Sequence, residues 1–123
     1  MPSVSEEELD RYRATCRKRD EEARRHQKRA HRDARGAARR AAAILRTEFG
    51  VGRVVLFGSV ARGAFLGPHS DIDLAVDGLS ARDHARAVDR VQEASEERRI
   101  DLVRIEQCSP SLKTDLSADG IEL

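Results

Sequence analysis

The chain has 123 residues, of which 37% are charged and 3% aromatic, so it can form one small domain with an aliphatic core, with or without an appendage. Its formal net charge of +1 hides an uneven distribution. Residues 1–50 hold 14 Lys and Arg against 9 Asp and Glu, whereas residues 51–123 hold 9 against 13. The sequence shows no metal-ligand spacing of its two cysteines, no apolar run of membrane-spanning length and no secretory signal. We therefore expect a reduced, cytoplasmic protein without a membrane span.

Residues 1–48 are expected to form a charged helical segment. Ser5, with Glu8 three residues later, is a capping-box pattern, and no proline follows until well beyond Glu48. We expect either one protruding helix or two helices that separate near Gly36. A seven-residue repeat favours a narrow seam against another surface, although its companion positions are mostly polar. The repeat consists of Leu9, Cys16, Ala23, Ala30, Ala37 and Ile44.

The middle of this segment is strongly basic. Residues 11–46 contain 14 Lys and Arg against 4 Asp and Glu. Such an excess suits an acidic partner or nucleic acid, and it is equally typical of a solvated helix face. Tyr12 is the one aromatic residue of this range, so the segment offers little for base stacking.

Residues 49–123 alternate strand and helix patterns and are expected to form a second unit. The predicted strands are residues 53–57, 71–76 and 100–105. Helices are predicted to begin after Ser80 and after Ser109, where serine is a favoured N-cap. The first of these helices is expected to bury Ala81, Ala85, Val88 and Val91.

A glycine-serine turn follows the first predicted strand directly. Gly58 lets the backbone approach a ligand because it has no Cβ atom. A short helix over residues 58–63 would direct free N–H groups at whatever lies in the turn. Gly58 and Ser59 are therefore candidate phosphate-binding residues.

Two aspartates open the second predicted strand. Side chains alternate along a strand, so Asp71 and Asp73 point to the same face while Ile72 faces the core. Neighbouring carboxylates repel each other, and Mg²⁺ removes that repulsion while keeping positions open for phosphates. The two motifs together predict metal-assisted transfer from a nucleoside triphosphate.

These motifs resemble the signature of the DNA polymerase beta nucleotidyltransferase superfamily, and most of all its minimal branch, the MntA-like antitoxins. The resemblance is carried by Gly58-Ser59-Val60-Ala61-Arg62-Gly63 and by Ser70-Asp71-Ile72-Asp73-Leu74, and it extends over roughly residues 40–123. It implies a mixed α/β fold with a three-to-four-stranded mixed sheet flanked by helices, here preceded by the long basic helix. The expected units are residues 1–48 and residues 49–123.

The resemblance also implies the site. Asp101, on the third predicted strand, is expected to complete a catalytic and metal-binding set with Asp71 and Asp73, either as a ligand of Mg²⁺ or as the base for the acceptor hydroxyl. Arg62 is expected to reach a phosphate of ATP, beside Gly58 and Ser59, although a surface role fits it as well.

The resemblance implies a function, the transfer of AMP from ATP to a tyrosine of a HEPN-type ribonuclease toxin. This transfer inactivates the toxin. About 75 residues suffice for the metal site and the triphosphate, so the partner is expected to supply the acceptor surface. Two alternatives stay open, which are nucleotide transfer to RNA and neutralisation by binding alone. A small-molecule acceptor, as in aminoglycoside nucleotidyltransferases, fits less well.

Overall fold

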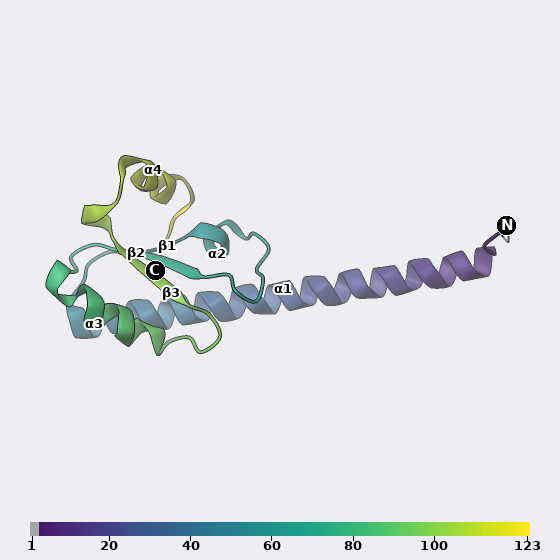
Figure 1. Cartoon of the computed structure of the whole chain (residues 1–123), viewed down its shortest axis with the longest axis horizontal. Helices are drawn as coiled ribbons and strands as arrows, with labels where there is room; N and C mark the ends of the chain where they lie inside the picture. The colour runs from purple at the N-terminus through teal and green to yellow at the C-terminus, as the bar shows by residue number, and fades with distance from the viewer. Residues whose placement is uncertain (1–2) are drawn as a thin grey trace.

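Four strands form one mixed sheet in the computed structural model, which describes residues 3–123 (Figure 1). The strand order is β3-β2-β1-β4, with β1 antiparallel to both β2 and β4, and β2 parallel to β3. The strands are β1 (Val54–Phe57), β2 (Ile72–Val76), β3 (Ile100–Arg104) and β4 (Ile121–Glu122). The α-helices are α1 (Glu6–Phe49), α2 (Gly58–Arg62), α3 (Ala81–Gln92) and α4 (Pro110–Asp119), and a 3₁₀ turn, η1, spans Ile105–Gln107.

Helices cover both faces of the sheet (Figure 1). The larger core lies between the sheet and the helices α1 and α3, and it contains Leu45, Leu56, Ile72, Leu74 and Val91. A smaller cluster on the opposite face packs Val55, Ala75 and Leu116 together, so α4 covers that side. The predicted mixed α/β architecture with flanking helices is confirmed.

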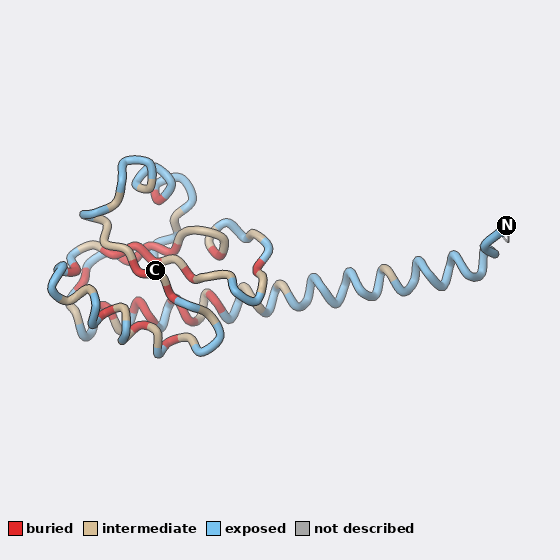
Figure 2. Tube along the Cα trace, in the orientation of Figure 1, coloured by how far each residue is buried: buried red, intermediate tan, exposed pale blue. Residues whose placement is uncertain are grey.

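Helix α1 is continuous over 44 residues, about 66 Å at 1.5 Å per residue, so it does not divide near Gly36. Its buried residues are Ala34, Ala37, Ala38, Ala41, Ala42 and Leu45, which recur with the spacing of one helix face. Figure 2 shows the rest of the helix, toward the N-terminus, extending away from the body as an almost wholly exposed rod. Of the seven-residue repeat, Ala37 is buried, Ala30 and Ile44 pack partly buried against the core, Cys16 is half-exposed, and Leu9 and Ala23 are exposed.

The core crosses the boundary predicted at residue 48, because Ala34 to Leu45 share one cluster with the strands. The division into residues 1–48 and 49–123 thus stays a prediction. Residues 1 and 2 of the first unit lie outside the described residues. No helix within residues 3–123 combines the length and the apolar character that a membrane crossing requires.

Most predicted boundaries agree with the structure to one residue, and the serine caps are confirmed. Ser5, Ser80 and Ser109 each accept a hydrogen bond from the N–H three residues on, at 3.2, 3.1 and 3.1 Å. One prediction about α3 is wrong, because Ala81 and Ala85 are exposed and Ala87 is buried instead. Ile121 and Glu122, directly after Gly120, form the edge strand β4.

A truncation separates the rod of α1 from its packed end. Deletion of residues 1–22 should change the free energy of unfolding by less than about 0.5 kcal/mol, because residues 3–22 are exposed apart from the half-exposed Cys16. Deletion of residues 1–36 should cost about 2–3 kcal/mol, since it removes the buried Ala34 and the hydrogen bonds of Gln27 and His31 to the loop after α2. Urea unfolding of both truncations checks this. Equal losses would contradict the assignment of residues 27–36 to the folded body.

Candidate active site

Asp73 lies at the centre of the candidate site, on the face of the sheet that α4 covers. It pairs in register with Asp101 on the parallel strand β3 and with Phe57 at the end of the antiparallel strand β1. Residues paired across neighbouring strands point to the same face, so the carboxylates of Asp73 and Asp101 are neighbours. Asp71 directly precedes β2, and its charge also acts on Asp73. Asp71 and Asp101 thus lie close enough to Asp73 for their charges to act on its carboxyl.

The surroundings of Asp73 disfavour its negative charge. Burial, and after it the charges of Asp101 and Asp71, together raise the pKa of its carboxyl from 3.8 to about 6, while Arg62 opposes them. Burial and two like charges therefore act in the same direction. A cation placed here would reverse the balance.

Gly58 makes room for the Asp73 carboxylate. Gly58 has φ of +74°, which non-glycine residues rarely adopt, and a Cβ atom built on it would lie 2.1 Å from Asp73 Oδ2. The turn after β1 and the aspartate on β2 therefore fit together only because residue 58 has no side chain.

Helix α2 begins at this turn. Phe57 takes the N-cap position but provides no side-chain hydrogen bond, so the first N–H groups of α2 have no side-chain cap. Gly58, Ser59, Arg62 and Asp73 line a hollow of about 280 Å³ beside the sheet. The predicted phosphate-binding residues and the central aspartate thus share one cavity.

Helix α4 contributes two acidic residues that the sequence analysis missed. Asp115 and Asp119 line the same hollow, together with Leu112. A signal for them existed, because Leu112 and Leu116 fix the inward face of α4, and positions 115 and 119 lie on that same face. The hollow therefore has carboxylates on two sides and a single cation, Arg62.

A third missed residue, Arg98, fixes the loop before β2. Its Nη1 donates to the carbonyl oxygens of Gly67 and Ser70 at 2.7 and 3.0 Å. Because Asp71 follows Ser70, these hydrogen bonds define where the first aspartate enters the site.

The chemistry of the donors fits a divalent cation such as Mg²⁺, which prefers carboxylate oxygens and leaves positions for water and phosphates. Asp73 and Asp101 are partly buried next to each other, and a cation would relieve their repulsion. As they stand, however, no three His, Cys, Asp or Glu side chains of residues 3–123 form a group that could hold a metal ion. The carboxylates would therefore have to turn toward the ion, with water or substrate oxygens completing its coordination.

The repulsion around Asp73 gives a pH-dependent prediction. Because the folded state raises the pKa of Asp73, the metal-free fold is penalised above about pH 6, and the penalty disappears as the pH falls toward 4. Asp73→Asn should therefore stabilise the protein by about 1 kcal/mol near pH 8, a value kept small because solvent screens this partly buried group, and by nothing near pH 4. Urea unfolding with a chelator at both pH values measures the difference. Asp89→Asn, on an exposed position of α3, is the charge-matched control.

A pair of glycines isolates the contact between Gly58 and Asp73. Gly63→Ala places a Cβ at φ of +68° with nothing within 4 Å, so it should cost only the backbone penalty of about 1–2 kcal/mol. Gly58→Ala carries the same penalty and should cost about 1 kcal/mol more, because the Asp73 carboxylate must leave its rotamer. In an Asp73→Ala background the extra cost should vanish. Identical costs for the two glycines in the wild-type background would contradict the contact.

Comparison with known proteins identifies the fold. The family model described as polymerase beta, nucleotidyltransferase, matches residues 40–123. A tyrosine-to-alanine mutant of the toxin-antitoxin MntA-HpeT is 26% identical, with a TM-score of 0.58 over 69% of this chain and 69% of that chain. A toxin-antitoxin with AMP-PNP is 25% identical, with a TM-score of 0.57 over 66% and 67%.

A third solved structure shares the fold at lower identity. A chain from the structure of a tri-AMPylated Shewanella oneidensis HEPN toxin in complex with MNT antitoxin is 20% identical to this chain. The TM-score is 0.55 over 72% of this chain and 70% of that chain. No curated protein matches the chain. Because the family model covers more than half of its residues, the chain belongs to the polymerase beta nucleotidyltransferase family, and its structural neighbours support the MntA-like branch.

Proposed function

We propose that this nucleotidyltransferase transfers AMP from ATP to a hydroxyl of a protein partner, a HEPN-type toxin, and thereby acts as its antitoxin. The observation that carries the proposal is the position of Asp73, in register with Asp101 and against the Cα of Gly58. This arrangement puts the Asp73 carboxylate next to the turn that would hold the phosphates. Transfer from a triphosphate needs both devices within one cavity.

The donor nucleotide would lie with its phosphates over the start of α2. The uncapped N–H groups there and the guanidinium of Arg62 supply positive charge to phosphate oxygens. Mg²⁺, held by Asp71, Asp73 and Asp101, would neutralise the triphosphate where it meets the carboxylates. Without that ion, Asp115 and Asp119 on α4 would repel the same phosphates.

The acceptor would approach Asp101 on β3. Its hydroxyl oxygen forms a bond to the α-phosphorus, the bond from that phosphorus to the bridging oxygen breaks, and pyrophosphate leaves. The hydroxyl proton passes to the Asp101 carboxylate and then to solvent. Asp101 is partly exposed, as a residue that serves an incoming protein side chain must be.

The toxin partner is proposed from the neighbours. Two of the similar chains come from a toxin-antitoxin, one of them with AMP-PNP, and a third from a HEPN toxin complex. RNA as acceptor, and neutralisation without transfer, are the competing outcomes of the following experiment.

Two aspartate variants test the reaction. Asp71→Asn and Asp101→Asn should each slow AMP transfer by about 100-fold or more, since each removes charge stabilisation or the base from the reacting centre. Asp101→Asn should keep its affinity for ATP within about threefold, because its main role is toward the acceptor. The measurement is transfer of a radioactive α-phosphate from ATP, with Mg²⁺, to a purified HEPN-type toxin. Calorimetry gives the ATP affinity.

The controls separate the alternatives. Asp89→Asn removes one exposed carboxylate from α3 and should leave transfer unchanged. Label in RNA instead of protein would replace the protein acceptor by RNA. Inhibition of the toxin by the wild-type chain without any label would show neutralisation by binding. Normal transfer by Asp71→Asn at saturating Mg²⁺ would overturn the assignment of the site.

A further inference from the structure

We infer that α1 and the loop after α2 form a binding site for single-stranded nucleic acid, separate from the active site. Lys28, Arg32, Arg35 and Arg39 of α1 line a recess of about 670 Å³ together with the aromatic ring of Phe65 from the loop. We call these five residues and the space between them the basic recess. The inference does not depend on the transfer reaction.

The four cations of the basic recess lie on one face of α1. Their spacings of four, three and four residues bring them into one row about 16 Å long. The same face of the helix continues along the rod with Arg25, Arg24 and Arg17. Glu21 lies among them and adds one negative charge. A row of regularly spaced cations suits a backbone of regularly spaced phosphates.

These cations form few ion pairs within the described part of the chain. Among residues 3–123, Lys28, Arg35 and Arg39 form no ion pair, and Arg32 has one contact of 3.9 Å with the exposed Asp33. An exposed pair at that distance contributes little. The row is therefore available to an anionic ligand.

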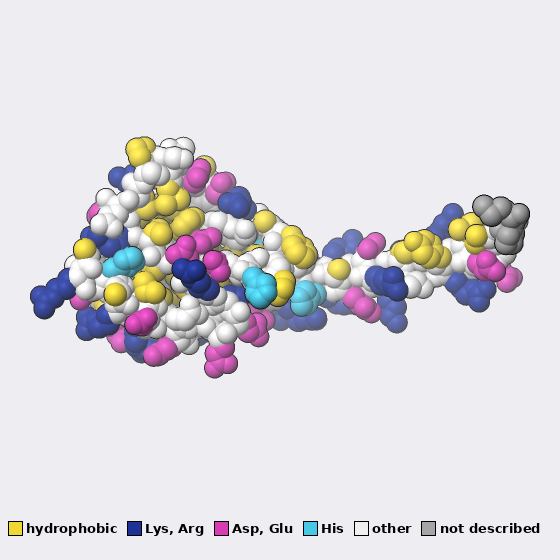
Figure 3. All heavy atoms as spheres, viewed as in Figure 1, with side chains coloured by type: hydrophobic (Ala, Val, Ile, Leu, Met, Phe, Trp, Pro, Cys, Tyr) yellow, Lys and Arg dark blue, Asp and Glu magenta, His cyan; other side chains and the backbone are white. Residues whose placement is uncertain are grey.

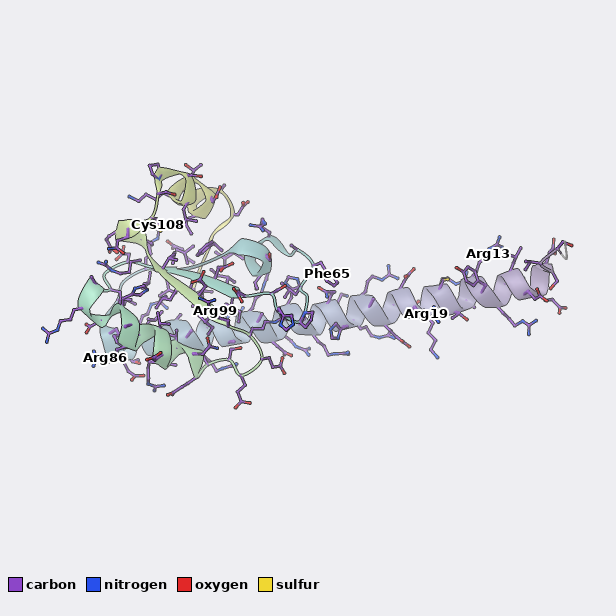
Figure 4. All side chains as sticks on the ribbon, viewed as in Figure 1. Arg13, Arg19, Phe65, Arg86, Arg99 and Cys108 are labelled. Atoms are coloured by element: carbon purple, nitrogen blue, oxygen red, sulfur yellow. The ribbon has the colours of Figure 1, made fainter. Side chains whose placement is uncertain are left out.

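Phe65 gives the basic recess an aromatic surface. It is 78% exposed, and Figure 4 shows it on the loop beside α1, where the helix leaves the body. Hydrogen bonds on both sides fix its backbone. His31 Nε2 lies 2.7 Å from the carbonyl oxygen of Ala64, and the Gln27 amide both donates to and accepts from the backbone of Leu66 at 2.9 Å.

Two lining side chains also keep polar atoms without a partner. The buried Nδ1 of His31 and Nε of Arg35 form no hydrogen bond in the described structure. Leaving such groups unpaired is unfavourable. A ligand with oxygen acceptors, as phosphates and bases have, would pair with the guanidinium of Arg35.

An exposed aromatic ring beside a row of cations distinguishes nucleic acid from an acidic protein surface. Carboxylates would need the cations alone, whereas a nucleotide uses the cations for phosphate and the ring for stacking of its base. Helix α2 separates the two sites, since its first residues line the active-site hollow and the residues after its end line the basic recess. We therefore assign the ligand as unpaired RNA or DNA, because bases within a duplex cannot stack on Phe65.

Binding of short labelled single-stranded RNA and DNA to the full-length protein, without ATP, tests the inference by fluorescence anisotropy. Changing Lys28, Arg32 and Arg39 together to glutamine should weaken binding at least tenfold at about 50 mM salt and reduce the slope of log affinity against log salt by about 2. Phe65→Ala should weaken binding by about tenfold and leave the slope unchanged, because stacking releases no counterions. Duplex RNA should bind more weakly than the single strand.

Matched controls exist on the same chain. Arg11, Arg13 and Arg19 changed together to glutamine remove the same charge from the distant part of the rod, where Figure 4 shows Arg13 and Arg19, and should have much the smaller effect. Tyr12→Ala removes another exposed aromatic ring and should leave affinity unchanged. Equal losses for the two triple variants, full affinity of Phe65→Ala, or binding of polyglutamate but not of RNA or DNA would each overturn the inference.

Discussion

The partly buried carboxylate of Asp73 is the constraint around which this fold is arranged. It stands in register with a second carboxylate, Asp101, and is close enough to Asp71 for both charges to raise its pKa. The protein accepts this repulsion next to a glycine that no other residue can replace without contact. Such an arrangement is unfavourable for a metal-free protein and favourable once a cation and a triphosphate are present. Under the proposed reaction, stability and catalysis place opposite demands on the same side chain.

Helix α1 has two roles that its composition alone does not separate. Its last third is a wall of the core, where alanines allow close approach to the sheet. Arg40 donates a hydrogen bond to the carbonyl oxygen of Ala94, just after α3, and Glu48 forms an ion pair with Arg90 of α3. Residues 6–29 form a rod that contributes no core residue within the described structure. On the face seen in Figure 3, charged side chains cover the rod and hydrophobic ones gather mainly near its tip. A lone helix of this kind is helical in part because its packed end supplies a nucleus, so residues 6–27 need only propagate it.

The sequence predicted the features that depend on local periodicity. It failed for features that depend on which face of a helix is buried or on contacts between residues distant in the chain. Strand limits, serine caps and the shared face of Asp71 and Asp73 follow from alternation and capping, whereas Asp101 was expected from the resemblance to the polymerase beta superfamily. The predicted phase of α3 is wrong, because Ala85 and Ala87 are chemically equal and the packing of α3 on both α1 and β3 determines which of them is buried. Asp115 and Asp119 enter the hollow through the packing of α4, and Phe65 meets α1 across a separation of about 30 residues. Neither neighbourhood is encoded at short range.

Helix α2 joins these two neighbourhoods, and its orientation agrees with the charges around it. Its first residues border the hollow that contains Asp73, where the positive end of the helix dipole faces carboxylates. Its last carbonyls lie toward Gly63 and Ala64, which border the cations of α1. The dipole of a five-residue helix is weak, yet its positive end lies near carboxylates and its negative end near cations, and both arrangements are favourable. Because α2 packs directly on β1 and β2 and its following loop is fixed by Gln27 and His31, the same short element sets the geometry of the active site and of the basic recess.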